Sequence, residues 1–89
     1  MMYPYITLPD ETEIIHSQIL DKDGVRSVEV HFERPTEHGF DTARCSLPDY
    51  RWIEREGFTD KEIQDFTTLL EHNAHLIYRF AERGGACCA

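Results

Sequence analysis

One segment near the C-terminus constrains the fold of this chain more than any other. Thr59 and Glu62 have the Thr-x-x-Glu spacing of a capping box, in which each side chain accepts a hydrogen bond from the other residue's backbone amide. Phe58 and Ile63 stand at the two positions of a hydrophobic staple around this box. The pattern predicts a long helix over residues 60–82.

Apolar residues recur in the predicted helix at spacings of three and four, which is typical of a helix that packs on a sheet. Acidic residues in its first turn and arginines near its last turn suit the helix dipole. Gly84 and Gly85 are expected to end the helix, and residues 85–89 are expected to form a flexible tail. The stripe consists of Ile63, Phe66, Leu70, Ala74, Ile77 and Ala81.

Four upstream segments alternate in the manner of strands, at about residues 3–8, 12–20, 25–34 and 40–47. Residues 35–39 are expected to form a loop. Asp23 and Gly24 separate the second and third segments and predict a tight hairpin. A two-residue turn would place His16 opposite His31 on the outer face of the sheet, whereas a three-residue or four-residue loop would change this pairing.

Residues 48–56 are ambiguous. Pro48 suits the first turn of a helix and Gly57 suits its end, so we predict a short helical segment, with an extended conformation as the alternative. The expected fold is α+β: a four-stranded, mainly antiparallel sheet, this short helical segment and the long helix packed on the sheet.

Length, charge and cysteine count limit the classes of function. The chain has 89 residues, so residues 1–84 are expected to form a single domain. Nine basic and seventeen acidic residues leave a net charge of −8, which argues against direct binding to nucleic acid. No apolar run approaches the ~20 residues that span a bilayer. The odd count of three cysteines does not suggest a disulfide framework, so a reduced, cytoplasmic protein is expected.

The chemistry-bearing residues do not form a convincing active site. His72 and His75 are three residues apart on the predicted helix, but no third ligand accompanies them. Cys45 is expected on the core face of its strand, without an adjacent base. We therefore predict a non-enzymatic protein with no catalytic, cofactor-binding or metal-binding residues. A small histidine-dependent metal protein or enzyme, built on His16, His31 or His75, is kept as an alternative.

Two stretches of the chain, residues 31–45 and 73–81, resemble small bacterial proteins with no assigned activity. The first reads His-Phe-Glu-Arg-Pro-Thr-Glu-His-Gly-Phe-Asp-Thr-Ala-Arg-Cys, and the second reads Asn-Ala-His-Leu-Ile-Tyr-Arg-Phe-Ala. The resemblance would cover most of the chain. It implies no activity and carries no catalytic residues over to this sequence.

The apolar face of the predicted helix is broader than one stripe, and this breadth points to a protein–protein interaction module, with a homodimer as the expected assembly. A second hypothesis is an acidic regulator of a basic partner, in the manner of an antitoxin or a nucleic-acid mimic. Clustering of Glu29, Glu33, Glu37 and Asp41 on one face would favour that second hypothesis. The predicted interaction residues are Leu69, Asn73, Leu76, Phe80, Tyr50 and Trp52.

Overall fold

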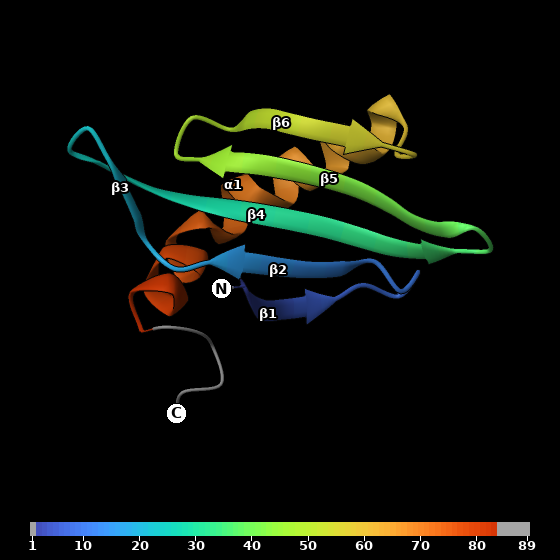
Figure 1. Cartoon of the computed structure of the whole chain (residues 1–89), viewed down its shortest axis with the longest axis horizontal. Helices are drawn as coiled ribbons and strands as arrows, with labels where there is room; N and C mark the ends of the chain where they lie inside the picture. The colour runs from blue at the N-terminus through green and yellow to red at the C-terminus, as the bar shows by residue number, and fades with distance from the viewer. Residues whose placement is uncertain (1, 84–89) are drawn as a thin grey trace.

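The computed structural model describes residues 2–83 and shows an antiparallel sheet of six strands with one long helix across one face (Figure 1). The strand order is β1-β2-β4-β5-β6, and β3 pairs with the first part of β4. The predicted α+β class is confirmed, but the sheet has six strands instead of four. The elements are β1 (Met2–Thr7), β2 (Glu13–Ser17), β3 (Leu20–Lys22), β4 (Val25–Thr36), β5 (Gly39–Leu47), β6 (Arg51–Glu56) and α1 (Asp60–Glu82).

The predicted start of α1 is confirmed. The Thr59 hydroxyl accepts a hydrogen bond from the Glu62 amide at 3.2 Å, and the Glu62 carboxylate accepts one from the Thr59 amide at 3.0 Å. The helix ends at Glu82 with Arg83 as its C-cap, and the predicted tail, with Gly84, lies outside the described residues. The predicted stripe faces the sheet, where Ile63, Phe66, Leu70, Ile77 and Ala81 are buried and Ala74 packs on the core.

We expect Thr59→Ala to lower the free energy of unfolding by about 1 kcal/mol, because the Glu62 amide loses its hydrogen-bond acceptor. Urea unfolding followed by circular dichroism measures this change. Thr68→Ala is the matched control, since the Thr68 hydroxyl bonds the Gln64 carbonyl in the middle of the helix and leaves no terminal amide unsatisfied. Equal losses in the two variants would contradict a specific role for the cap.

The core lies between the sheet and α1 and is centred on stacked aromatic rings. The Phe32 and Phe66 rings stack with centroids 4.3 Å apart, and the Trp52 ring lies 5.5 Å from that of Phe32. Figure 1 shows α1 behind the strands, so the face of the sheet that points toward the viewer carries no helix in the described part of the chain. We call this the outer face. The buried strand residues of the core are Ile14, Val28, Val30, Phe32, Ala43, Cys45 and Leu47.

The predicted Asp23–Gly24 hairpin is confirmed, but the predicted pairing of β2 is wrong. Asp23 and Gly24 have φ angles of 53° and 81°, as a two-residue turn with both central residues left-handed requires. Strand β3 pairs with β4 in the register that the two-residue turn predicts. Strand β2 is shifted from that register by one residue, which places His16 opposite Val30. A one-residue shift exchanges the two faces of a strand. His16 is therefore fully buried on the helix side and does not face His31.

The predicted loop at residues 35–39 is shorter than expected, because β4 continues through Thr36 and β5 begins at Gly39. Strand β2 pairs with β4 only as far as Glu33, so Pro35 lies where β4 has a single neighbouring strand. The missing amide hydrogen of Pro35 therefore does not interrupt the ladder between β2 and β4.

The preferred short helix at residues 48–56 is also wrong, and the extended alternative holds. Residues 51–56 form β6, which pairs with β5. Trp52 is the residue of β6 that turns toward the core, and its indole N–H donates to the Thr67 hydroxyl at 3.1 Å. Pairing along β5 and the burial of this ring outweigh the local helix signals of Pro48 and Gly57.

Candidate functional site

A groove lies between the β1–β2 turn and the N-terminal half of α1. Its volume is about 320 Å³. Apolar side chains from the turn and from the helix form its floor, and three carboxylates stand at its rim. We call this feature the acidic groove. Its floor consists of Leu8, Pro9, Phe66 and Leu69, and its rim consists of Asp10, Glu62 and Asp65.

The β1–β2 turn is held in one conformation by its own hydrogen bonds. The Leu8 amide donates to the Thr12 carbonyl at 2.8 Å, and the Glu11 amide donates to the Leu8 carbonyl at 2.9 Å. The Asp10 carboxylate accepts a bond from the Thr12 amide at 3.0 Å. These bonds define the position of Leu8 on the floor and of Asp10 on the rim.

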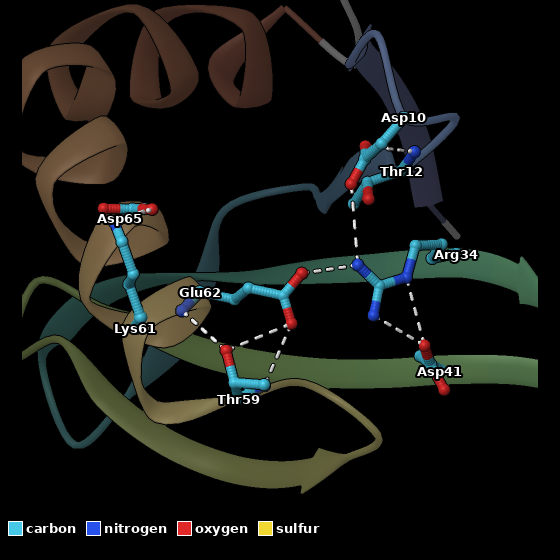
Figure 2. Close-up of polar contacts among 8 residues, drawn as sticks. All are labelled: Asp10, Thr12, Arg34, Asp41, Thr59, Lys61, Glu62 and Asp65. Atoms are coloured by element: carbon cyan, nitrogen blue, oxygen red, sulfur yellow. Dashed lines mark hydrogen bonds and ion pairs between the residues drawn. The ribbon is translucent and has the colours of Figure 1, made fainter.

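Arg34 connects the two sides of the groove (Figure 2). Its guanidinium donates twice to Asp41, at 2.7 and 3.0 Å, and also donates to Glu62 of α1. It forms an ion pair with Asp10 of the turn at 3.5 Å. The guanidinium carbon lies 4.6 Å from the centre of the Phe58 ring, within the range of a cation–π contact. Arg34 therefore joins the turn, the β4–β5 hairpin and α1.

The groove keeps an excess of negative charge. The three rim carboxylates and Asp41, which shares Arg34 with two of them, face two cations, Arg34 and Lys61, which leaves two negative charges uncompensated. Two hydrogen bonds lower the pKa of Glu62 and keep it ionised: the bond from Arg34 has the larger effect, and the bond from the Thr59 amide has the smaller one. The Asp65 side chain is 66% exposed and forms an exposed ion pair with Lys61 at 3.5 Å. Asp65 is therefore accessible to a charged ligand.

A second hollow, of about 190 Å³, lies on the outer face of the sheet, and several charged side chains around it form a chain of ion pairs. Glu29 accepts a bond from His31 at 2.8 Å and forms an ion pair with Arg44 at 3.5 Å. Arg44 in turn lies 3.5 Å from Glu54. Glu33 also lines the hollow, and the apolar residues there, Phe32 and Ala43, are fully buried, so the hollow offers a ligand no apolar floor.

The four acidic residues whose clustering would favour the acidic-regulator hypothesis separate in the structure. Glu29 and Glu33 lie on the outer face of β4, whereas Asp41 lies on the helix side and bonds Arg34. Glu37 lies in the turn between β4 and β5. This placement counts against a phosphate-like row of acids on one face.

Of the predicted interaction residues, Leu69 reaches the acidic groove. Asn73 is held inside the subunit, because its side-chain oxygen accepts a bond from the Tyr5 hydroxyl at 2.7 Å. The Phe80 ring lies 5.9 Å from that of Tyr5, and Leu76 is half-buried. The helix flank is therefore partly covered by β1, and the role of these residues in binding stays a prediction.

The other two predicted residues, Tyr50 and Trp52, also pack against the core of the subunit. The large apolar residues that are exposed in the described part of the chain belong to strands and not to α1. They are Ile6, Val25, Phe40 and Ile53, with exposed fractions between 42% and 64%.

Sequence reasoning missed Leu8, Asp10 and Arg34 as parts of the site. One signal was available for Asp10, because an aspartate two residues before a threonine amide is typical of an Asx-turn. A second signal was the alternation of β4, which places Arg34 on the same face as Phe32 and therefore toward the helix.

The chemistry-bearing side chains lie apart from the groove. Burial, and to a smaller extent the negative charge of Asp49, raises the pKa of the Cys45 thiol to about 12. Cys45 is therefore a protonated core residue. His16 is buried, with Nδ1 at 2.8 Å from the Ser17 carbonyl oxygen. His72 and His75 are exposed on α1. Within residues 2–83, no group of three or more histidine, cysteine, aspartate or glutamate side chains is placed to hold a metal ion.

Comparison with protein families, with curated proteins and with solved structures gives no match to this chain. Over the residues that the structure describes, no helix has the length and apolarity needed to cross a membrane.

Proposed function

We propose that this protein is a non-enzymatic protein-interaction module and that the acidic groove binds a basic segment of a partner protein. The observation that carries the proposal is the combination of an apolar floor with a carboxylate network, made of the rim and the adjoining Asp41, that holds two uncompensated negative charges. The partner segment would present a lysine or arginine beside an apolar side chain.

Lysine and arginine match both parts of the groove. Their aliphatic stems can cover apolar surface while the charged group stays in contact with water and carboxylates. A stem over Leu8 and Leu69 would bring its cationic end to Asp65 or Asp10. The net charge of −8 would also attract a basic partner from a distance and speed its association. The proposal includes a cytoplasmic location, consistent with a buried, free Cys45.

The acidic-regulator hypothesis is a narrower form of the same proposal, in which the bound segment belongs to a nucleic-acid-binding surface of the partner. The groove would serve that role without a row of phosphate-like acids. Direct binding of this protein to nucleic acid is not part of the proposal, because its net charge is strongly negative.

Titration of the isotope-labelled protein with a short peptide of alternating arginine and leucine tests the groove. We expect the largest changes in amide chemical shift at Leu8, Asp65 and Leu69, and we expect affinity to fall as salt is added. A peptide with glutamine in place of arginine should bind much more weakly. Shift changes spread evenly over the surface would contradict a binding site at the groove.

We expect Asp65→Lys to weaken binding of the arginine–leucine peptide about ten-fold, because a rim carboxylate is replaced by a like charge of the ligand. Glu71→Lys is the matched control, since Glu71 is an exposed residue of α1 that does not line the groove and its reversal changes the net charge equally. Equal weakening in both variants would show that only the total charge matters.

A further inference from the structure

We infer that β6 pairs with the β6 of a second copy of this chain, antiparallel and around a two-fold axis between Ile53 and Glu54. This pairing would join the two sheets into one continuous sheet. The inference concerns the edge of the sheet and does not depend on the acidic groove. Three observations support it: the difference between the two sheet edges, the order of charges along β6 and the position of a β-bulge.

The two edge strands differ in how well they are protected against pairing. Strand β1 carries an exposed proline, Pro4, and an irregularity between Pro4 and Ile6, both of which hinder the addition of another strand. Strand β6 contains no proline, and in the described part of the chain it pairs with β5 alone. Figure 1 shows β6 as the outermost strand at its end of the sheet. The exposed Ile53, at 46%, adds apolar area to this edge.

Charged side chains usually keep the edges of sheets apart, but the signs along β6 favour one self-pairing. The strand reads Arg-Trp-Ile-Glu-Arg-Glu from residue 51 to residue 56. An antiparallel register centred between Ile53 and Glu54 places Arg51 of each copy opposite Glu56 of the other. Two-fold symmetry produces this ion pair twice. Opposite charges at directly facing positions stabilise an antiparallel pair.

Facing residues must also lie on the same side of the joined sheet. A β-bulge in β6 satisfies this condition: Trp52 lies opposite Cys45 and Glu54 lies opposite Arg44, so Ile53 is an extra residue between them. Arg51 and Glu56 are five positions apart, so in a regular strand they would point to opposite faces. The bulge shifts the alternation by one residue, and Arg51 then lies opposite Ser46 while Glu56 lies opposite Thr42. Ser46 and Thr42 are both on the outer face of β5, so both ends of β6 present their charges on one face.

The same shift matches the inner positions of β6. Trp52 lies opposite Cys45 and Arg55 lies opposite Ala43, and both positions of β5 face the helix side. Arg55 also contacts Asp60 of α1, which agrees with this orientation. In the joined sheet, Trp52 of one copy would face Arg55 of the other, an arrangement suited to a cation–π contact. At residues 51, 52, 55 and 56 the pattern of faces around the proposed axis is therefore the same in both directions.

Sedimentation equilibrium of the full chain tests the pairing through charge reversal. The wild type is expected to show about twice the chain mass of 10.4 kDa. Arg51→Glu and Glu56→Arg each place like charges opposite one another twice, so each variant alone should dimerise about ten-fold less tightly or worse. An equal mixture of the two variants should recover the wild-type affinity, because the mixed dimer again faces every Arg with a Glu at these positions.

Arg79→Glu and Glu71→Arg, both on the exposed side of α1, are the controls for net charge and should leave dimerisation unchanged. Circular dichroism checks that each variant is folded. A monomeric wild type would overturn the inference, and so would a mixture that dimerises no better than its two components. Dimers that survive both reversals but dissociate after Leu69→Lys and Leu76→Lys would assign the interface to the helix flank instead. Arg51→Glu and Glu56→Arg should each still bind the arginine–leucine peptide. Loss of dimerisation can therefore be distinguished from loss of binding at the acidic groove.

Discussion

Arg34→Ala should lower the free energy of unfolding by about 2–3 kcal/mol, because it leaves three carboxylates without their shared cation. The Arg34 side chain is 22% exposed, and those of Asp41 and Glu62 are 21% and 29% exposed, so water compensates for this loss only in part. Asp10, at 52% exposed, contributes less. The variant also removes the guanidinium that lies over the Phe58 ring. Urea unfolding at neutral pH measures the loss.

Arg26→Ala is the matched control for Arg34→Ala. Arg26 forms an ion pair with Glu82 at 3.0 Å, but the two side chains are 59% and 49% exposed. Its removal should cost about 0–1 kcal/mol, as is usual for surface pairs. Arg34→Lys should fall between the two, since lysine keeps the charge but cannot donate to two carboxylates in the same planar geometry. A loss in Arg34→Ala no greater than in Arg26→Ala would contradict the connecting role of Arg34.

The difference between wild type and Arg34→Ala should also depend on pH. The pKa of Glu62 is lower in the folded protein than in the unfolded chain, chiefly because of its bond with Arg34. The stabilisation that this bond provides is complete above the pKa of Glu62 in the unfolded chain, about 4.3 for a glutamate. It is lost as the pH falls through the lower pKa of Glu62 in the folded protein. The two unfolding curves should therefore approach each other in acid. A difference that stays constant down to about pH 2 would show that packing, and not charge, is responsible.

Gly57→Ala should lower the free energy of unfolding about as much as Arg34→Ala, by about 2–3 kcal/mol, for two separate reasons. Gly57 has a φ of 92°, which an alanine adopts only with strain. A Cβ at this position would also overlap with Oδ1 of Asp41 and lie 2.9 Å from its Cβ. Asp41 would have to move, and its two hydrogen bonds from Arg34 would be lost or distorted. Thermal and urea unfolding both measure this effect.

Gly24→Ala separates the two causes. Gly24 has a similar φ of 81°, but nothing lies within 4 Å of the place that an alanine Cβ would occupy, so this substitution should cost only the backbone strain, about 1 kcal/mol. Repeating Gly57→Ala in an Asp41→Ala background should lower its cost toward that of Gly24→Ala, because the carboxyl group is gone while the Cβ of residue 41 stays 2.9 Å away. Equal costs for the two glycines in the wild-type background would contradict the proposed contact with Asp41.

The parts of the fold that depend on local patterns were predictable. The capping box defined the start of α1, the Asp23–Gly24 turn defined one hairpin, and the alternation of β4 and β5 identified their core faces. The pairing of β2 was not predictable, because a one-residue irregularity between β2 and β3 leaves the local sequence pattern almost unchanged while it exchanges the faces of His16 and Ile15.

The conformation of residues 51–56 depended on neighbours that the local sequence does not contain. Pro48 and Gly57 favoured a helix, but β5 offered an open edge and Phe32 and Phe66 offered a surface for Trp52. Pairing and burial of this kind contribute more than local propensity in a short segment. Distant neighbours also explain why part of the predicted interaction surface lies away from the groove, since Tyr5 of β1 covers the helix flank near Asn73 and Phe80.

The sequence by itself determined the helix, its cap, the tight hairpin and the acidic character of the chain, because each follows from residues within a few positions of one another or from composition alone. Only the tertiary structure decided the acidic groove, since Asp10, Arg34 and Glu62 come from three distant segments and meet through ion pairs. It also decided the register of β2 and the face pattern of β6. Those depend on single-residue shifts between strands, whose free energies arise from contacts across the sheet and not from the strands themselves.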